Sequence, residues 1–260
     1  MAGPAKKSRV ISEAERNLTA YHEAGHAIVM KAMPNSDPVH QITIIPRGMA
    51  GGFTMSLPED EKFFMTKGDM VNMIKHLLGG RVAEALKLDD ISTGASNDLE
   101  RATAIARQMI TKYGFSSKLG PVSFSSSDEV FLGKDFSTRQ NYSEETASEI
   151  DAEIKHILES CYEATTNILK ENDEAFERVA QALLLIETLD GEQFNDLYEG
   201  KITPEELAEN VKARDEEIAE LNKAEAKESE RLEEERRQEA EERLKELQSV
   251  IVGDLKFEDS

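Results

Sequence analysis

The sequence predicts a mainly α-helical protein with one small β-sheet, followed by a charged helical tail. Apolar residues recur at helical spacing through most of residues 12–200, and only two short runs, 39–46 and 53–57, have the character of strands. From Pro204 to Gln248 the composition shifts to Glu, Lys, Arg and Ala. We therefore expect a flexible lead-in at 1–11, one domain at 12–200, and a tail at 201–260 that is a charged helix or partly disordered.

The first helix is predicted from its start to its end. Ser12 and Glu15 have the S-x-x-E spacing of a capping box, in which each side chain satisfies a backbone donor of the first turn. Apolar residues follow at helical spacing until Pro34, so the helix should reach about Met33. Gly25 inside this helix costs about 1 kcal/mol relative to alanine. We expect it to leave room for another segment or for the occupants of a metal site.

Two strands and a helix should follow. The first strand, 39–46, is rich in β-branched residues, and the second, 53–57, alternates between apolar and polar residues. A turn at 58–62 leads into a helix over about 67–86. The Gly79-Gly80 pair within this helix is unfavourable there, so it indicates a tight helix contact or a kink.

The second half of the domain is predicted to be helical apart from one irregular segment. A helix over 97–113 ends at Gly114, a typical C-terminal stop. Residues 115–142 lack clear periodicity, which is common in functional or mobile segments. Further helices are expected over 144–171, where Ser143 is the N-cap, over 173–187, and in a short form after Asp190-Gly191.

Charge and composition exclude several classes of protein. The formal net charge of −21 argues against a nucleic-acid partner, because a surface that binds nucleic acid must neutralise phosphate. No apolar run approaches the roughly 18–20 residues that cross a bilayer, and the first residues lack the apolar region of a signal peptide. The single cysteine, Cys161, excludes an internal disulfide and fits a reducing compartment.

The first helix carries the pattern H-E-x-x-H at His22, Glu23 and His26. Two histidines four residues apart lie on one face of a helix, where both reach a single Zn²⁺ at roughly 2.0–2.1 Å. Glu23 lies beside the first histidine, where it serves as base to a metal-bound water. A catalytic zinc also needs a third protein ligand and an open position for that water.

Four carboxylates after the strands are candidates for the third ligand: Glu84, Asp89, Asp90 and Asp98. Asp98 stands at the start of a helix, in line with its apolar stripe, which is an unusual place for a solvated carboxylate. Ser96 or Asn97 is available to cap that helix, which leaves Asp98 for a metal. Spacing alone leaves Asp98 and Glu84 as alternatives.

Several segments resemble, in order, the peptidase domain of the FtsH family of ATP-dependent zinc metalloproteases. They cover roughly residues 4–200 and read YHEAGHAIV, GGRVAEAL, STGASNDLERAT, KYGFSSKLGPVSF, FLGKDF, NYSEET and ETLDGEQF. The resemblance implies that His22, His26 and Asp98 bind Zn²⁺ and that Glu23 is the catalytic base. The glutamate of the family's G-G-R-x-A-E segment corresponds to Glu84, to which we assign the orientation of a ligand or neighbouring group.

The function implied by this resemblance is zinc-dependent endopeptidase activity on unfolded or extended polypeptides. A substrate chain should lie against an exposed strand edge, for which Gly52, Phe53, Thr54 and Met55 are the candidates. The alternative is a catalytically silent assembly or scaffold domain that binds partners through a ring and the acidic tail. Metal-assisted hydrolysis of a non-peptide substrate is less favoured, because no basic cluster for phosphate is apparent.

The resemblance also shapes what we expect of partners and location. Full-length members of the family carry membrane segments and an ATPase module ahead of the protease, and they form six-membered rings with the protease on the cytoplasmic side. This sequence has no transmembrane run and no G-x-x-x-x-G-K-[ST] phosphate loop. We therefore expect an isolated, cytoplasmic peptidase domain that forms a homohexamer and cleaves unfolded peptides without ATP.

Overall fold

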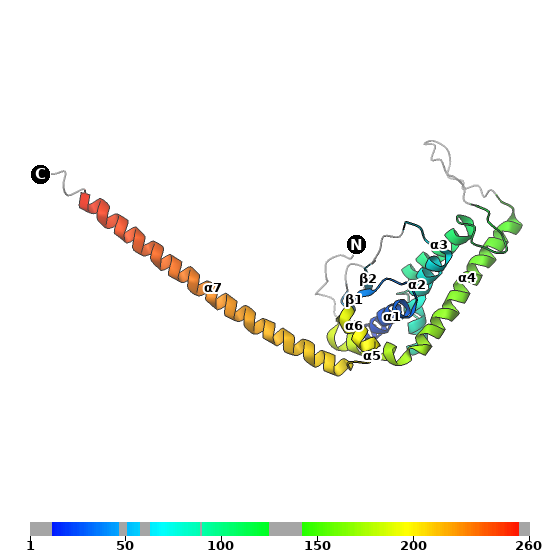
Figure 1. The fold of residues 1–260 in the computed structure, drawn as a ribbon, viewed down its shortest axis with the longest axis horizontal. Coiled ribbons are helices and arrows are strands. Elements are labelled where there is room, and N and C mark those ends of the chain that lie inside the picture. Colours follow the sequence, from blue (N-terminus) through cyan, green and yellow to red (C-terminus); the bar gives the residue numbers. More distant parts are fainter. Residues whose placement is uncertain (1–11, 47–50, 58–62, 89, 125–141, 255–260) are drawn as a thin grey trace, which may run out of the picture. The chain divides into compact units, whose positions relative to one another are not determined.

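The computed structural model describes residues 12–46, 51–57, 63–88, 90–124 and 142–254, with side chains up to residue 237. This part of the chain is mainly helical and includes one antiparallel sheet of three strands (Figure 1), which confirms the predicted fold class. Contacts divide the chain into one unit at Met1–Ala208 and another at Glu209–Ser260. The predicted lead-in, the turn at 58–62 and most of the irregular segment 115–142 lie outside the described residues, as does Asp89.

The described elements follow the predicted order, with one addition. They are α1 (Glu13–Ala32), β1 (Val39–Thr43), β2 (Phe53–Ser56), α2 (Lys67–Lys87), α3 (Ser96–Thr111), α4 (Glu144–Glu171), α5 (Asp173–Ile186), β3 (Thr188–Asp190), α6 (Gly191–Tyr198) and α7 (Pro204–Asp254). Strand β3 was not predicted, because three residues between two helices are too few to show alternation. The first strand is three residues shorter than the predicted 39–46, since β1 ends at Thr43.

The sheet has the order β2-β1-β3, so β2 is an edge strand. Ile42 of β1 is the register partner of both Thr54 in β2 and Leu189 in β3. Ile42 and Leu189 are fully buried, so this side-chain layer belongs to the core of the first unit. The arrangement leaves the outer edge of β2 without a strand neighbour among the described residues.

Helix α1 is the central element of the first unit (Figure 1). Its predicted capping box is present, because Glu15 N–H donates to Ser12 Oγ at 3.2 Å and Ser12 N–H donates to Glu15 Oε2 at 3.1 Å. Every residue from Ala20 to Met30 is buried, since α2, α5 and the sheet pack around the helix. The hydroxyl of Tyr21 donates to Glu177 Oε1 at 2.7 Å and joins α1 to α5.

Helices α1 and α2 approach closely because glycines lie at their contact. A Cβ added to Gly25 would lie 2.5 Å from Ala83 Cβ and 2.6 Å from the backbone oxygen of Gly79. A Cβ added to Gly79 would lie 3.0 Å from the backbone oxygen of Gly25, and one added to Gly80 would overlap the ring of His22. The predictions that Gly25 leaves room for another segment and that Gly79-Gly80 marks a tight helix contact are both confirmed.

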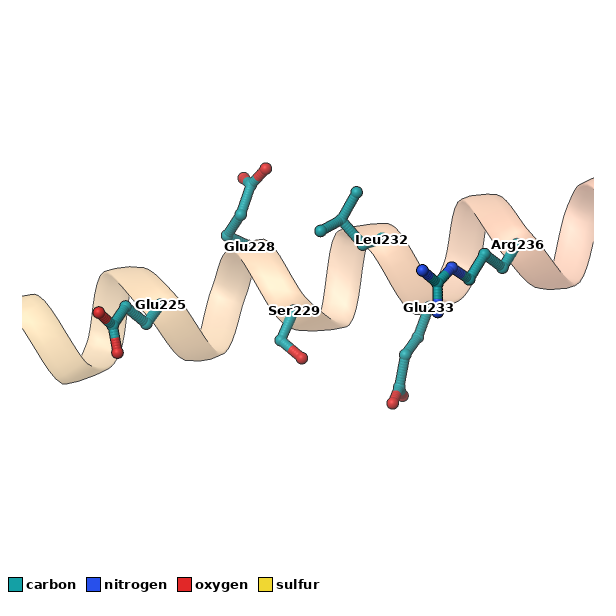
Figure 2. Close-up of a pocket in the computed structure, with 6 residues that line it drawn as sticks. All are labelled: Glu225, Glu228, Ser229, Leu232, Glu233 and Arg236. Atoms are coloured by element: carbon teal, nitrogen blue, oxygen red, sulfur yellow. The ribbon is translucent and has the colours of Figure 1, made fainter.

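The charged tail forms a helix, α7, as far as Asp254. Thr203 and Glu206 form a reciprocal cap at its start, with Glu206 N–H donating to Thr203 Oγ1 at 3.2 Å and Thr203 N–H donating to Glu206 Oε2 at 3.0 Å. In the second unit, Figure 2 shows five polar side chains and Leu232 extending from this single helix, and the described side chains there are almost all exposed. Arg231 pairs with Glu228 at 2.7 Å and with Glu235 at 3.7 Å, as expected of a solvated helix. None of the helices described has the length and apolar character needed to span a membrane.

The glycine contact makes a prediction about stability. Gly25→Ala should lower the free energy of unfolding by about 1–3 kcal/mol, because overpacking against backbone exceeds the helix-propensity gain of about 1 kcal/mol. Gly68→Ala is the matched control, since its added Cβ would have Thr66 Oγ1 as its nearest neighbour, at 3.6 Å. Urea unfolding of both variants measures the difference, and equal stability of the Gly25 variant and the unsubstituted chain would contradict the tight contact.

Candidate metal centre

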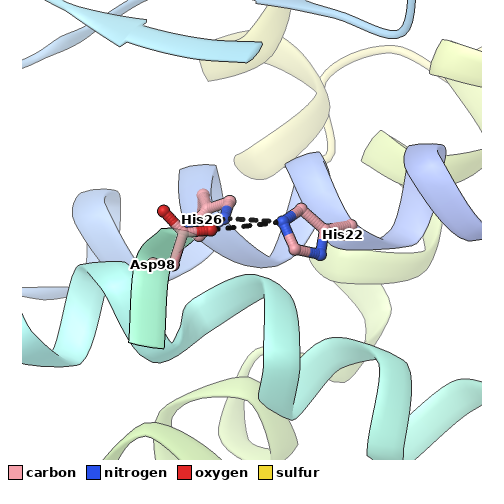
Figure 3. Close-up of side chains that lie close together, drawn as sticks. All are labelled: His22, His26 and Asp98. Carbon is pink, nitrogen blue, oxygen red and sulfur yellow. Dashed lines mark hydrogen bonds and ion pairs between the residues drawn. The ribbon is translucent and has the colours of Figure 1, made fainter. Parts of the chain in front are cut away.

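Three side chains from two helices converge at one point (Figure 3). Helix α1 contributes His22 and His26, whose Nε2 atoms lie 3.1 Å apart because four residues make about one helical turn. Helix α3 contributes Asp98, whose Oδ2 lies 3.6 Å from His22 Nε2 and 3.4 Å from His26 Nε2. Asp98 lies 72 residues beyond His26 in the chain, so it is the fold that brings this carboxylate to the two histidines.

The separations of these atoms suit a zinc ion. A tetrahedral zinc with bonds of about 2.0–2.1 Å has its donor atoms about 3.3–3.4 Å apart, and the three separations of 3.1, 3.4 and 3.6 Å bracket that value. Two imidazoles and one carboxylate are also a common donor set of catalytic zinc, which keeps a fourth position open. Three electron-rich atoms this close repel one another unless a proton or a cation lies between them. The residues therefore fit the group that the motif implies.

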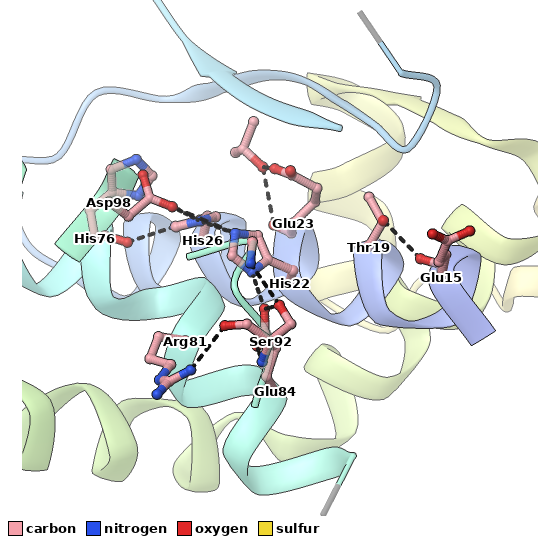
Figure 4. Close-up of polar contacts among 12 residues, drawn as sticks. Glu15, Thr19, His22, Glu23, His26, His76, Arg81, Glu84, Ser92 and Asp98 are labelled. Atoms are coloured by element: carbon pink, nitrogen blue, oxygen red, sulfur yellow. Dashed lines mark hydrogen bonds and ion pairs between the residues drawn. The ribbon is translucent and has the colours of Figure 1, made fainter. Parts of the chain in front are cut away.

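Hydrogen bonds on the opposite side of each ring orient the two histidines. Nδ1 of His22 donates to Glu84 Oε1 at 2.7 Å, and Nδ1 of His26 donates to the backbone oxygen of His76 at 2.7 Å (Figure 4). With Nδ1 of each ring engaged in this way, both Nε2 atoms face Asp98. These contacts fix the tautomer as well as the position of each ring.

Glu84 lies behind His22, in the position that an orienting role requires. It is fully buried and accepts two hydrogen bonds from Ser92, from the backbone N–H at 2.7 Å and from the hydroxyl at 3.1 Å. Ser92 belongs to the loop that leads into α3, which carries Asp98. Glu84 therefore connects a histidine of α1 to the segment that positions the third donor. Its pKa is lowered, because the hydrogen bonds from His22 and Ser92 outweigh the effect of burial.

The start of α3 differs from the expectation. The helix begins at Ser96, its N-cap is Ala95, and no side chain caps it, so the expected capping by Ser96 or Asn97 is wrong. Both residues lie inside the first turn, where neither is in the N-cap position. Asp98 also lies in this turn, where the helix dipole favours a negative charge, and its carboxylate contacts the histidines.

His22 and Asp98 shift the pKa of one another. Burial alone would lower the pKa of His22, but its hydrogen bonds with Asp98 and Glu84 and nearby carboxylate charges raise it to about 9. The pKa of Asp98 is lowered, because its interactions with His22 and His26 outweigh its desolvation. Since Nδ1 of His22 already donates to Glu84, a second proton on this ring occupies Nε2. A metal ion must displace that proton, so metal affinity should fall as the pH is lowered.

Glu23 is buried beside the donors and is held by the edge strand. The hydroxyl of Thr54 donates to Glu23 Oε2 at 2.8 Å and also lies 3.1 Å from the backbone oxygen of Glu23. Burial raises the pKa of Glu23, while the charges of His26 and His22 and the hydrogen bond from Thr54 oppose the rise. A carboxylate of raised pKa is a better proton acceptor than an ordinary glutamate.

The donors and Glu23 line a cavity of about 670 Å³. Gly52, Phe53 and Thr54 of the predicted substrate edge also line it, whereas Met55 is not among its lining residues and is 37% exposed. A Cβ on Gly52 would lie 2.6 Å from the backbone oxygen of Thr43 and 3.0 Å from Glu23 Cγ, so only glycine lets the chain pass this close. The edge strand therefore runs directly past the candidate base.

His76, which is not among the predicted site residues, also lines the cavity. A usable signal was present, because His76, Gly80 and Glu84 are spaced by four residues and therefore share the face of α2 that contacts α1. Burial, together with the charge of His26, lowers the pKa of His76 to about 3. The ring is therefore neutral at ordinary pH.

Comparison with known proteins decides the family. A sequence profile of Peptidase family M41 matches residues 9–197. The chain belongs to peptidase family M41. The resemblance noted from the motifs is thereby confirmed, and it extends over most of the first unit.

The curated relatives of this M41 chain are longer proteins. It is 57% identical over 202 residues to ATP-dependent zinc metalloprotease FtsH 1 of Thermoanaerobacter sp. (strain X514), covering 77% of this chain and 33% of the relative. It is 59% identical over 203 residues to FtsH 2 of Alkaliphilus metalliredigens (78% and 30%), and 51% identical over 207 residues to FtsH of Bacillus subtilis (79% and 32%). The match thus spans about a third of the length of these relatives.

The orientation of His22 in this M41 domain generates a prediction. Glu84→Gln should weaken zinc binding about 10- to 100-fold, because the neutral amide no longer holds the Nδ1 proton as firmly. Competition with a coloured chelator measures the affinity. Glu163→Gln, which changes an exposed carboxylate on α4, is the matched control and should bind zinc normally. Unchanged affinity of the Glu84 variant would show that the contact does not orient a ligand.

Proposed function

We propose that this M41 domain is a zinc-dependent endopeptidase that hydrolyses peptide bonds of unfolded or extended polypeptides. One observation carries the proposal: two imidazole nitrogens and a carboxylate oxygen converge at zinc-like separations beside a buried glutamate. The relatives are named ATP-dependent zinc metalloproteases, which supports the same chemistry for this chain. His22, His26 and Asp98 would hold the ion, which when bound supplies Lewis-acid activation of water and of the peptide carbonyl.

Glu23 is the proton carrier in this proposal. Thr54 holds Oε2, so we assign proton transfer to Oε1. Glu23 takes a proton from the attacking water as its oxygen bonds to the peptide carbon. The same carboxyl group then gives that proton to the amide nitrogen as the carbon–nitrogen bond breaks, so the carboxylate is restored at the end of the cycle.

The edge strand β2 is the proposed site for the substrate backbone. An extended chain added to this edge would make main-chain hydrogen bonds, which tolerate many sequences. Gly52, Phe53 and Thr54 border the cavity, so such a chain would pass next to Glu23 and the three donors. Met55, further along the strand and exposed, would contact the substrate outside the cavity.

Further features of the proposal come from the resemblance to the FtsH family. We propose polypeptides as substrates, a homohexamer as the assembly and the cytoplasm as the location. We also propose that 12–200 is the peptidase domain and 201–260 a separate tail, which the contact boundary between Ala208 and Glu209 supports.

The central test is Glu23→Gln in the full chain. Cleavage of a fluorogenic extended peptide should fall by at least about 100-fold, because the amide cannot accept a proton. Zinc content by elemental analysis should remain near one ion per chain, since Glu23 is not a donor. Chelation of the unsubstituted chain should abolish cleavage and zinc should restore it. Cleavage that persists in the Glu23 variant would refute its role as base.

The contact between Thr54 and Glu23 predicts a change in pH dependence. Thr54→Val removes the hydrogen bond that lowers the pKa of Glu23, so that pKa should rise further. Because the base must be deprotonated, the acid limb of the kcat/KM profile should move to higher pH. Zinc content is measured at each pH to separate this effect from metal loss. Thr166→Val on α4 is the control, and an unshifted limb in the Thr54 variant would contradict the contact's role.

A further inference from the structure

His76 is a functional group beside the metal centre that the proposed mechanism leaves unused. Its ring lines the cavity, and its centroid lies 5.1 Å from that of His26. The contact with Nδ1 of His26 uses the backbone oxygen of His76, so it does not occupy the ring. A titratable side chain this close to the three donors therefore has its own hydrogen-bonding capacity available.

The environment of the ring indicates which nitrogen carries the proton. Nδ1 of His76 is buried and has no hydrogen-bond partner among the described residues. A neutral imidazole has one N–H, and a buried N–H without a partner is both costly and rare. The proton therefore belongs on Nε2. Because Nδ1 is sealed off while the ring forms part of the cavity wall, Nε2 is the nitrogen that faces the cavity.

The ring presents one hydrogen-bond donor to the cavity. Nδ1 is buried without a partner among the described residues, so the single N–H of the neutral imidazole is placed on Nε2, where a bound substrate can reach it. The nearby carboxylates of Glu23 and Asp98 offer only acceptors when ionised, so a donor beside them suits an oxygen of the substrate.

We propose that His76 donates an Nε2–H hydrogen bond to the carbonyl oxygen of the peptide bond that is cleaved. Negative charge develops on this oxygen when water adds to the carbonyl carbon, and a fixed donor stabilises that charge more than it stabilises the neutral carbonyl. His76 would therefore act mainly on kcat. This inference rests on the proposed endopeptidase function and adds to it a residue that contacts the reacting atoms.

Three variants of the full, zinc-loaded chain test the proposal. His76→Leu removes the donor but keeps the backbone oxygen that binds His26, so zinc content should be unchanged. We expect kcat on a fluorogenic peptide to fall about 10- to 100-fold with KM within about 2-fold, as for loss of a donor to a charged oxygen. His76→Gln, whose side-chain amide is a neutral donor, should recover most of kcat. His40→Leu, which removes an exposed histidine of β1, is the control and should be fully active.

Binding supplies a second measurement. A peptide phosphonate presents an anionic oxygen where the charge would develop, so His76→Leu should lose affinity for it by about the same factor as kcat, but not for the corresponding unreactive peptide. Should His76→Leu fail to fold, His76→Met replaces it with the same expectation.

The outcomes separate this inference from the proposed function. Unchanged kcat in a folded, zinc-loaded His76→Leu variant, or a His76→Gln variant as slow as the leucine variant, overturns the donor role. Loss of zinc from His76→Leu also overturns it, since His76 would then act only through His26. If the unsubstituted chain cleaves peptides in a Glu23-dependent manner in these cases, the endopeptidase proposal stands. If the unsubstituted chain does not cleave peptides at all, both proposals fail.

Discussion

The close contact between α1 and α2 is the constraint on which the rest of the structure depends. Glycines on both helices let the backbones approach, and Gly80 leaves the space that the ring of His22 fills. At this distance α2 supplies hydrogen-bond acceptors to both histidines, from the side chain of Glu84 and the backbone of His76. A larger residue at the contact would separate the rings from these acceptors. The orientation of both histidine rings therefore depends on the close packing of α1 and α2.

The two ring nitrogens of each histidine have different contacts in the candidate metal centre. Nδ1 atoms face the protein and are satisfied by α2, while Nε2 atoms face Asp98 and one another. The donor atoms that face one another are unfavourable together unless a positive charge lies between them. A proton on His22 provides such a charge, in keeping with the raised pKa of His22. Packing therefore holds three electron-rich donor atoms together in an arrangement that suits a cation.

Sequence reasoning predicted the elements best where local signals were strong. The capping box at Ser12, the H-E-x-x-H spacing and the glycine pair of α2 are all local, and the structure contains the features expected from each. Sequence spacing alone could not choose between Asp98 and Glu84, because the choice depends on where α3, which packs against α2 and α4, places its first turn relative to α1. The resemblance to a family resolved that ambiguity, and the geometry places Asp98 with the histidines and Glu84 behind them.

The parts that escaped prediction depend on tertiary contacts. Strand β3 is too short to carry a pattern, and it exists because β1 supplies its hydrogen bonds. The start of α3 was misassigned because capping propensity favours Ser or Asn, whereas the loop is held by Glu84 through Ser92. His76 shares a helix face with Gly80 and Glu84, but that spacing does not show that His76 borders the cavity, which depends on how α1, α2 and α3 pack.

The hydrogen bond between Thr54 and Glu23 has a mechanical consequence. The short strand that we propose as the substrate site also holds, through Thr54, the carboxylate that we propose as the base. Displacing β2 therefore displaces the base, and steadying β2 steadies it. A polypeptide that pairs along the whole of β2 would hold Glu23 in position. A polypeptide that pairs with only part of β2 would stay bound, but Glu23 would be misaligned. Discrimination among polypeptides would then appear in the speed of turnover more than in the strength of binding.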